Sequence, residues 1–202
     1  MRAPLGTAAR GSTATRLVLG LLALLVLATS TVVASPAQAG DPRWVFYSHD
    51  HTRYRSPWFA GAHRIMVPFG CTSAPYYSPD PRCAHQHGFH HGIDVAMRCG
   101  TPLYAAVRLR VVSHASLGPA YGDNPVLLRS RRRGFDLVIG HTQRVYVHPG
   151  DVVRRGAMFA RANDQGAPDG CHLHFEQRAV GGGLSTAVWP RTLLRLTARS
   201  AG

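Results

Sequence analysis

From Met66 onward the sequence consists of short apolar runs that are interrupted by glycine, proline and aspartate. No window of about 11 residues carries apolar side chains at the spacing of a helical face. Short runs at regular intervals are typical of strands joined by turns, so we predict an antiparallel, mainly β domain with little helix. One helical turn is expected at Arg191–Leu196, directly after Pro190. The candidate strands are Ile93–Ala96, Leu103–Ser113, Pro125–Ser130, Asp136–Gly140, Arg144–Val147, Met158–Ala162 and His172–Gln177.

The first residues of the chain have the features of a secretory signal peptide. Three arginines come first, namely Arg2, Arg10 and Arg16. An almost unbroken apolar run follows at Leu17–Ala28, and residues 37–39 (Ala-Gln-Ala) have the small-x-small form of a signal-peptidase site. We therefore predict that residues 1–39 are a signal peptide and that the protein is secreted, extracellular or associated with the cell wall. The alternative is a retained membrane anchor, because Leu17–Ala34 is nearly long enough to span a bilayer.

Cleavage after Ala39 would remove 39 of the 202 residues and leave 163, which is enough for one domain with a hydrophobic core. Residues 40–65 are aromatic and basic without a clear period. We expect this lead-in to wrap the edge of the domain formed by residues 66–202, with binding to the cell wall as the alternative. We expect a monomer, with no stable membrane span once the signal peptide has been removed.

The mature chain would be strongly cationic. All 23 basic residues are arginines, three of them lie in the predicted signal peptide, and none of the ten acidic residues does. The net charge of the remainder is therefore +10 with histidine counted as neutral. Such a secreted protein suits an anionic partner such as a wall polymer or a membrane surface. Nucleic acid is the other polyanion, but the secretion signal argues against it, and we expect none to be bound.

All four cysteines lie in the exported part of the chain, where an even count favours two disulfides. Cys71 and Cys83 flank a segment rich in proline, serine and tyrosine, and they are close enough in sequence to close it as a loop. Cys99 and Cys171 then remain for the second bridge. The absence of a C-x-x-C pattern argues against a cysteine-based zinc site.

Two groups of histidines carry the candidate chemistry. In His90-His91-Gly92-Ile93-Asp94, a straight strand would hold His90 and Asp94 about 13 Å apart. Zinc ligand bonds are only about 2 Å long, so the backbone must fold between these residues, and we expect Gly92 to supply the conformational freedom.

The second group is His172-Leu173-His174-Phe175-Glu176. On a strand its two histidines and its glutamate share one face, while the leucine and the phenylalanine point into the core. Two imidazoles and a carboxylate backed by apolar residues make a metal-site geometry. Spacing alone leaves open which imidazole binds metal and which one works beside it.

Other hydrolase plans have little support. Glu176 is the only glutamate in the chain, so the H-E-x-x-H zinc-protease motif is absent, and there is no G-x-S-x-G nucleophile elbow. Proton transfer must therefore fall to histidine, aspartate or tyrosine. Metal-assisted hydrolysis is the interpretation that remains.

Taken in order, these motifs resemble those of the lysostaphin/LytM-type zinc peptidases, which hydrolyse bacterial peptidoglycan. The resemblance rests on H-x-G-I-D, C-G-T-P-L-Y-A-A, V-I-G-H, V-x-P-G-D-V-V-R-R-G and G-C-H-L-H-F-E, and it covers roughly Arg64 to Arg178. It implies the family's antiparallel fold, related to the duplicated hybrid motif.

The resemblance also implies roles for particular residues. His90, Asp94 and His174 match the three zinc ligands, and His172 and His141 match the two catalytic histidines. His148 is the rival of His141, because Tyr146-Val147-His148 echoes the family's Y-x-H. Three protein ligands would leave a fourth position on the zinc open for water, as catalytic sites require.

Three further features of the sequence allow more than one interpretation. Glu176 is either a carboxylate that orients an imidazole or a plain surface acid. The segment 129–134 is expected to be a solvated hairpin turn, with a contact to anionic wall polymers as the functional alternative. Residues 121–124 are expected to form a turn, with Tyr121 as a candidate groove residue.

The function implied is that of a secreted zinc endopeptidase that cleaves stem or cross-bridge peptides of peptidoglycan. The alternative is a non-hydrolytic LytM-like module that binds the wall or regulates an amidase. This chain departs from the family pattern at Ala106–Arg110 and in the loop Gln165–Gly170. Neither departure removes a ligand, but both bear on the shape of the substrate groove.

Overall fold

The computed structural model describes residues 40–112 and 117–199. The predicted signal peptide lies outside the described residues, as do residues 113–116 and 200–202. Within the described part of the chain, no helix is both long and apolar enough to cross a membrane.

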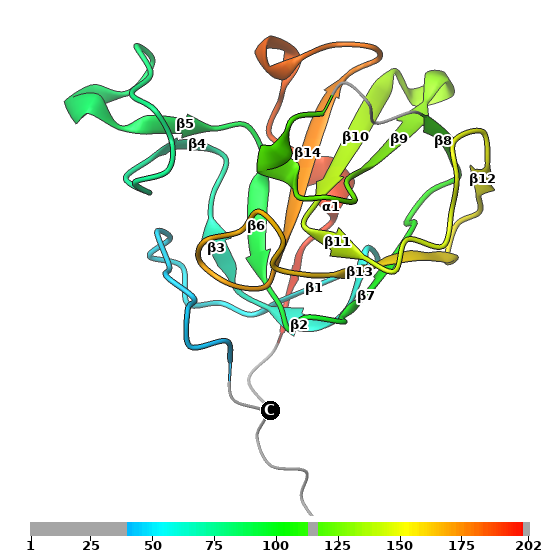
Figure 1. Cartoon of the computed structure of the whole chain (residues 1–202), viewed down its shortest axis with the longest axis horizontal. Coiled ribbons are helices and arrows are strands. Elements are labelled where there is room, and N and C mark those ends of the chain that lie inside the picture. The colour runs from blue at the N-terminus through cyan, green and yellow to red at the C-terminus, as the bar shows by residue number, and fades with distance from the viewer. Residues whose placement is uncertain (1–39, 113–116, 200–202) are drawn as a thin grey trace, which may run out of the picture. The chain divides into compact units, whose positions relative to one another are not determined.

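The larger sheet has seven strands and carries most of the candidate site. Its strands lie in the order β12-β8-β9-β10-β14-β6-β3 (Figure 1). Every neighbouring pair in it is antiparallel. The strands are β3 (Ile65–Val67), β6 (Ile93–Ala96), β8 (Leu109–Val112), β9 (Val126–Ser130), β10 (Phe135–Gly140), β12 (Val152–Val153) and β14 (His172–Ala179).

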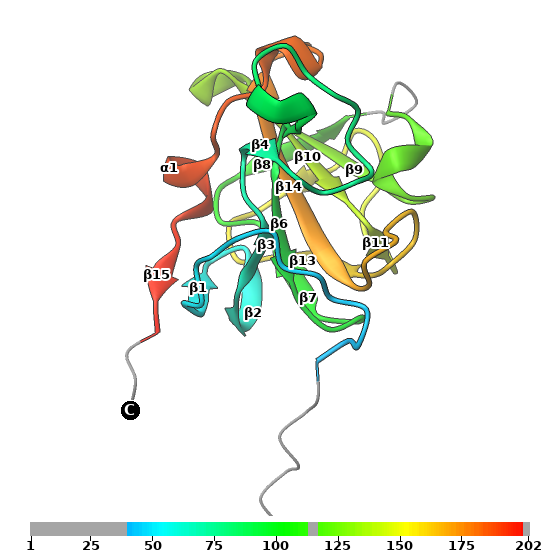
Figure 2. The ribbon, with the colours of Figure 1, turned by 90° about the vertical axis from the view of Figure 1, so that its left-hand side faces the viewer.

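The second sheet has six strands in the order β11-β13-β7-β2-β1-β15. Figure 2 shows β15 next to β1, with which it pairs, so the end of the described chain returns to its beginning. A separate hairpin of β4 (Gly70–Thr72) and β5 (Gly88–His90) projects to the left in Figure 1. The six strands are β1 (Tyr54–Ser56), β2 (Phe59–His63), β7 (Pro102–Tyr104), β11 (Thr142–Gln143), β13 (Met158–Ala162) and β15 (Thr197–Ala198).

Helical structure is confined to short turns. Among the described residues there is one α-helical turn, α1, which spans Arg191–Leu194, close to the expected position. The 3-10 turns are η1 (Ala84–Gln86), η2 (Pro119–Tyr121), η3 (Arg131–Arg133) and η4 (Leu184–Thr186). The mainly β, antiparallel fold class is therefore confirmed.

One continuous hydrophobic core joins the two sheets. On β14, Leu173 and Phe175 are fully buried on the inner face, as the alternation predicted. Trp58 from the lead-in packs edge-on against Phe175, with ring centroids 5.1 Å apart. The lead-in also supplies β1 and β2, so this segment takes part in the sheet as well as covering its edge. The inner face of β14 is fixed by apolar packing, which leaves the other face for polar side chains.

Two strand predictions were wrong. The run Leu103–Ser113 is split, because β7 ends at Tyr104 in one sheet and β8 begins at Leu109 in the other. The connection stays apolar because residues 105–107 cross the core and are buried. Arg144–Val147 forms no strand, because Arg144 has a φ of 47°, which extended backbone does not allow.

Both disulfides that we predicted are present. Cys71 pairs with Cys83 at a Cα–Cα distance of 5.5 Å and closes the loop of residues 72–82. Cys99 pairs with Cys171 at 5.2 Å, which ties the segment after β6 to the residue before β14. The second bridge therefore joins the two histidine groups covalently.

Candidate metal centre and active site

The register of β6 and β14 brings the two histidine groups together. His174 lies directly opposite Asp94 in this antiparallel pair. His90 ends β5, and the chain then turns through Gly92 into β6. Gly92 is needed for a close approach, because an added Cβ would lie 2.7 Å from Cε1 of His174 and 2.9 Å from the carbonyl oxygen of Phe175. Its φ lies outside the left-handed region, so steric room matters here, where we had expected conformational freedom.

Three buried side chains converge on one point. Nδ1 of His174 lies 2.9 Å from Oδ1 of Asp94 and 3.2 Å from Nε2 of His90, and that Nε2 lies 3.4 Å from the same carboxylate oxygen. These separations match the edge of a tetrahedron, about 3.3 Å, around an ion with bonds of about 2 Å. Nδ1 of His90 is 3.1 Å from the carbonyl of Pro68, so Nε2 is the nitrogen turned to the cluster. The residues present therefore fit a zinc-type ion.

The electrostatics of this cluster also favour a cation. Burial works against charge on His174, but the carboxylates of Asp94 and Glu176 outweigh it and raise the pKa of the imidazole to about 9. Burial likewise opposes the charge on Asp94, but the surrounding imidazoles of His90, His172 and His174 hold its pKa well below the usual range. Positive charge is thus stabilised at a position that is almost closed to solvent.

Glu176 supports the cluster from behind. It is fully buried, so the interpretation as a surface acid was wrong. Its Oε2 lies 3.1 Å from Nε2 of His174, on the side of the ring away from Asp94. Arg178 donates to the other carboxylate oxygen, and the hydroxyl of Tyr121 donates to Oε2 at 3.0 Å. A histidine held in this way presents a fixed nitrogen to a metal ion.

His141 and His172 form a second pair of imidazoles beside the cluster. Their ring centroids are 4.3 Å apart, and His141 lies after β10 with a φ of 53°. Nδ1 of His141 is 2.7 Å from the carbonyl of Gln165, and Nδ1 of His172 is 3.0 Å from the carbonyl of Gly170. Each ring is therefore oriented by a carbonyl of the loop between β13 and β14, which leaves its Nε2 for chemistry.

Burial is the main cause that lowers the pKa of His141, and the positive charges of His172 and His174 add to it, so that the pKa falls to about 3. The imidazole is therefore neutral at neutral pH. His148 lies elsewhere, with 86% of its side chain exposed in the turn with Asp151. The structure thus brings His141 to His172, and it does not bring His148 there.

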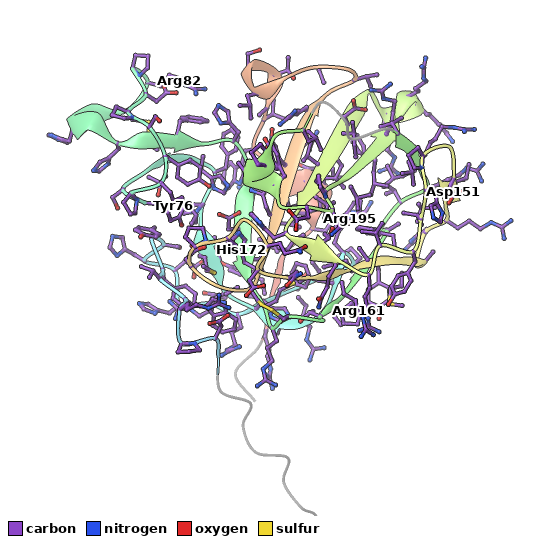
Figure 3. All side chains as sticks on the ribbon, in the orientation of Figure 1. Tyr76, Arg82, Asp151, Arg161, His172 and Arg195 are labelled. Atoms are coloured by element: carbon purple, nitrogen blue, oxygen red, sulfur yellow. A yellow bond between two sulfur atoms is a disulfide. The ribbon has the colours of Figure 1, made fainter. Side chains whose placement is uncertain are left out.

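Sequence reasoning missed a contact between the disulfide-closed loop and the loop before β14. The hydroxyl of Tyr76 donates to Oδ2 of Asp169 at 2.6 Å. Oδ1 of Asp169 is buried without a hydrogen-bond partner and lies 3.6 Å from Nδ1 of His172. Figure 3 labels Tyr76 to the left of His172. The sequence gives only two signals of this contact. Tyr76 lies between Cys71 and Cys83, and Asp169 lies three residues before the H-L-H motif.

These side chains surround a hollow of about 350 Å³. Tyr76 and Tyr77 of the disulfide-closed loop form one wall, and Tyr121 from η2 lies on another. His90, His141 and His174 line it together with Leu184 at η4. The expectation that Tyr121 contributes to a groove agrees with this position.

The fold and this buried histidine–aspartate cluster are those of a metallopeptidase domain. Residues 88–186 match the model of Peptidase family M23. The structure of LytU superposes with a TM-score of 0.54 at 26% identity, covering 65% of this chain and 83% of that chain. The catalytic domain of the antimicrobial peptidase lysostaphin from Staphylococcus simulans gives a TM-score of 0.52 at 25% identity, covering 66% and 92%.

The chain therefore contains a lysostaphin/LytM-type domain that belongs to peptidase family M23, and the resemblance seen in the sequence is confirmed. The family and the fold support a peptidase.

Proposed function

We propose that the protein is a secreted zinc endopeptidase that hydrolyses stem or cross-bridge peptides of bacterial peptidoglycan. The observation that carries this proposal is that two groups of side chains lie side by side, and that His90, His174 and His141 from these groups line one hollow. His90, Asp94 and His174 offer ligand atoms within 4.8 Å of one another, and two further imidazoles lie directly beside them. A structural metal site would need no such neighbours.

His90, Asp94 and His174 would hold the zinc ion through two nitrogens and one carboxylate oxygen. When bound, zinc would polarise the scissile carbonyl and make a water molecule more acidic by several pKa units. Glu176 keeps His174 oriented, and Asp94 offsets part of the positive charge. The buried carboxylates of Asp94 and Glu176 thus bind the metal ion or orient one of its ligands. Proton transfer therefore falls to other groups.

His141 and His172 are the groups that would move protons. Because loop carbonyls hold their Nδ1–H groups, each ring has its Nε2 lone pair available. One ring can accept a proton from the attacking water, and a protonated ring can donate to the leaving amine. As imidazolium, either ring would also stabilise negative charge on the tetrahedral oxygen. The low pKa of His141 keeps its ring neutral, so that its Nε2 lone pair is free.

The proposed substrate follows from the family and from the tyrosine side chains that line the hollow. Tyrosine side chains line its sides, and a peptide can be gripped by such surfaces without a deep specificity pocket. Secretion is supported by the leader in the sequence and by two disulfides, which persist in oxidising compartments. The proposed partner is thus a wall peptide, and a monomer suffices for the site.

The decisive experiment incubates the mature protein with purified peptidoglycans that differ in their cross-bridges and identifies released fragments by mass spectrometry. We expect fragments with new peptide termini, and their loss in His141→Ala. A protein that binds peptidoglycan but releases no fragment would instead be a wall-binding or amidase-regulating module. Release of sugar fragments without new peptide termini would also contradict the proposal.

A further inference from the structure

A second, larger hollow of about 780 Å³ lies at the β12–β8–β9 edge of the seven-stranded sheet. Eight arginines line it, and none of its described lining residues is acidic or aromatic. It shares no described lining residue with the hollow at the metal cluster. Figure 1 shows β8, β9 and β12 gathered on the right, away from the β4–β5 hairpin on the left.

These arginines come from four separate parts of the chain. Arg108 directly precedes β8, and Arg110 lies within it. Arg131–Arg133 form the η3 turn after β9. Arg155 follows β12, and Arg195 follows α1. A run of arginines in one turn would be an ordinary solvated surface, but only the fold brings these four segments to one hollow.

Their charges are barely compensated. Arg129 forms a two-pronged pair with Asp136, with distances of 2.7 and 2.6 Å. None of the other seven arginines forms an ion pair with a described residue. Arg110 lies directly opposite Arg129 in the β8–β9 register, and of these two guanidinium groups only that of Arg129 has a described carboxylate partner. An anion in the hollow would supply the partner that the described residues do not.

Arg195 adds an independent observation. It caps α1 in the left-handed region, with φ and ψ both 51°. Glycine is the residue that adopts this conformation without strain at a helix end. An arginine at this position has no conformational advantage over glycine, and Arg195 is one of the residues that line the hollow. Strain of this kind is often found where a side chain has a binding role.

We propose that this hollow binds a flexible polyol-phosphate polymer, the phosphodiester class of anionic polymer found in bacterial walls. Guanidinium groups match phosphate oxygens in a two-pronged geometry, and four segments can hold successive phosphates of one chain. Nucleic acid fits less well, since single-strand binding sites stack bases on aromatic side chains and this lining has none. The site would keep the enzyme on the wall while the metal cluster cuts, and it does not depend on the proposed activity.

The test measures affinity of the mature protein for purified poly(glycerol phosphate) over a range of salt concentrations. The first variant combines Arg131→Gln, Arg132→Gln and Arg133→Gln. The matched control combines Arg53→Gln, Arg55→Gln and Arg199→Gln, which removes the same charge from exposed positions at the β1–β15 edge. We expect at least a tenfold loss in the first variant and less than a twofold loss in the control. The slope of log affinity against log salt should fall by about two, at about 0.7 per phosphate contact.

Arg195→Gly separates binding from folding. We expect it to weaken polymer binding several-fold while the midpoint of thermal unfolding stays constant or rises, because glycine removes the strain. All variants should release fragments from polymer-free peptidoglycan at the rate of the parent protein. Equal losses in the variant and the control would show that net charge alone binds the polymer, and overturn the proposal. Equal affinity for a DNA oligonucleotide with the same number of phosphates would overturn it as well.

Discussion

The hydroxyl of Tyr76 donates a hydrogen bond of 2.6 Å to Asp169 across a sequence separation of 93 residues. Tyr76 belongs to the loop closed by Cys71 and Cys83. Asp169 lies near the end of the loop between β13 and β14, whose carbonyl groups orient the rings of His141 and His172. Because Oδ1 of Asp169 lies 3.6 Å from Nδ1 of His172, Tyr76 in the wall of the hollow is linked through Asp169 to the imidazole of His172.

The first prediction follows from this connection. Asp169→Asn keeps the size of the side chain but removes its charge, so His172 loses a stabilising partner whenever its ring becomes positive. We expect turnover on a wall peptide to fall about 10- to 100-fold, as is typical for the partners that orient site histidines. KM should change little, and zinc content should be unchanged.

Tyr76→Phe is the matched variant, because it leaves the carboxylate in place and removes only the hydroxyl. We expect a smaller loss of turnover from it than from Asp169→Asn. If Asp169→Asn raised KM alone, the aspartate would act on the groove wall and not on the imidazole.

Sequence periodicity was enough to predict the face of β14. Alternation on a strand has a period of two, so burial of Leu173 and Phe175 necessarily placed His172, His174 and Glu176 on the opposite face. The burial of Glu176 could not be predicted, because Tyr121 contacts it from η2 and alternation along β14 does not relate these two residues. Alternation also could not predict the contact between Tyr76 and Asp169, because these residues lie in two separate loops.

Local backbone conformation accounts for the strand predictions that were wrong. The residues at 144–147 alternate like a strand, but Arg144 has a positive φ that no hydrophobic pattern reveals. The run 103–113 reads as one strand because residues 105–107, which connect the two sheets, are apolar and buried like the strands on either side. The arginine-lined hollow was equally out of reach, since its four segments meet only in the folded chain.

The second prediction concerns metal. The mature protein should contain about one zinc ion per chain, and Asp94→Ala should lose it, because two imidazoles alone remain. Removal of zinc from the parent protein with a chelator should lower the midpoint of thermal unfolding, since a ligand that binds the folded state stabilises it. Atomic absorption and calorimetry measure both. Full zinc occupancy in Asp94→Ala would mean that the ion binds elsewhere.

The third prediction distinguishes His141 from His148. His141→Ala should retain zinc and fold normally while losing about 10²- to 10⁴-fold in turnover, the usual contribution of a general acid–base group. His148→Ala is the matched control, because that side chain is 86% exposed and pairs only with Asp151 at 3.8 Å. Its turnover should stay close to that of the parent protein. An inactive His148→Ala beside an active His141→Ala would reverse the assignment.

The fourth prediction compares the two disulfides, which close loops of different length. The sequence separations are 12 residues for Cys71–Cys83 and 72 residues for Cys99–Cys171. On the chain-entropy model, removal of the short bridge should cost about 3 kcal/mol and removal of the long one about 4.4 kcal/mol. Serine substitutions in pairs, followed by denaturant unfolding, measure this difference.

The two bridges should differ more in function than in stability. The double variant Cys71→Ser with Cys83→Ser frees the loop that carries Tyr76, so we expect a higher KM for wall peptides and unchanged zinc binding. The double variant Cys99→Ser with Cys171→Ser loosens the junction between the strands of Asp94 and His174, and it should weaken zinc binding in a competition assay. Equal effects of both on KM and on zinc affinity would show that the bridges act only through global stability.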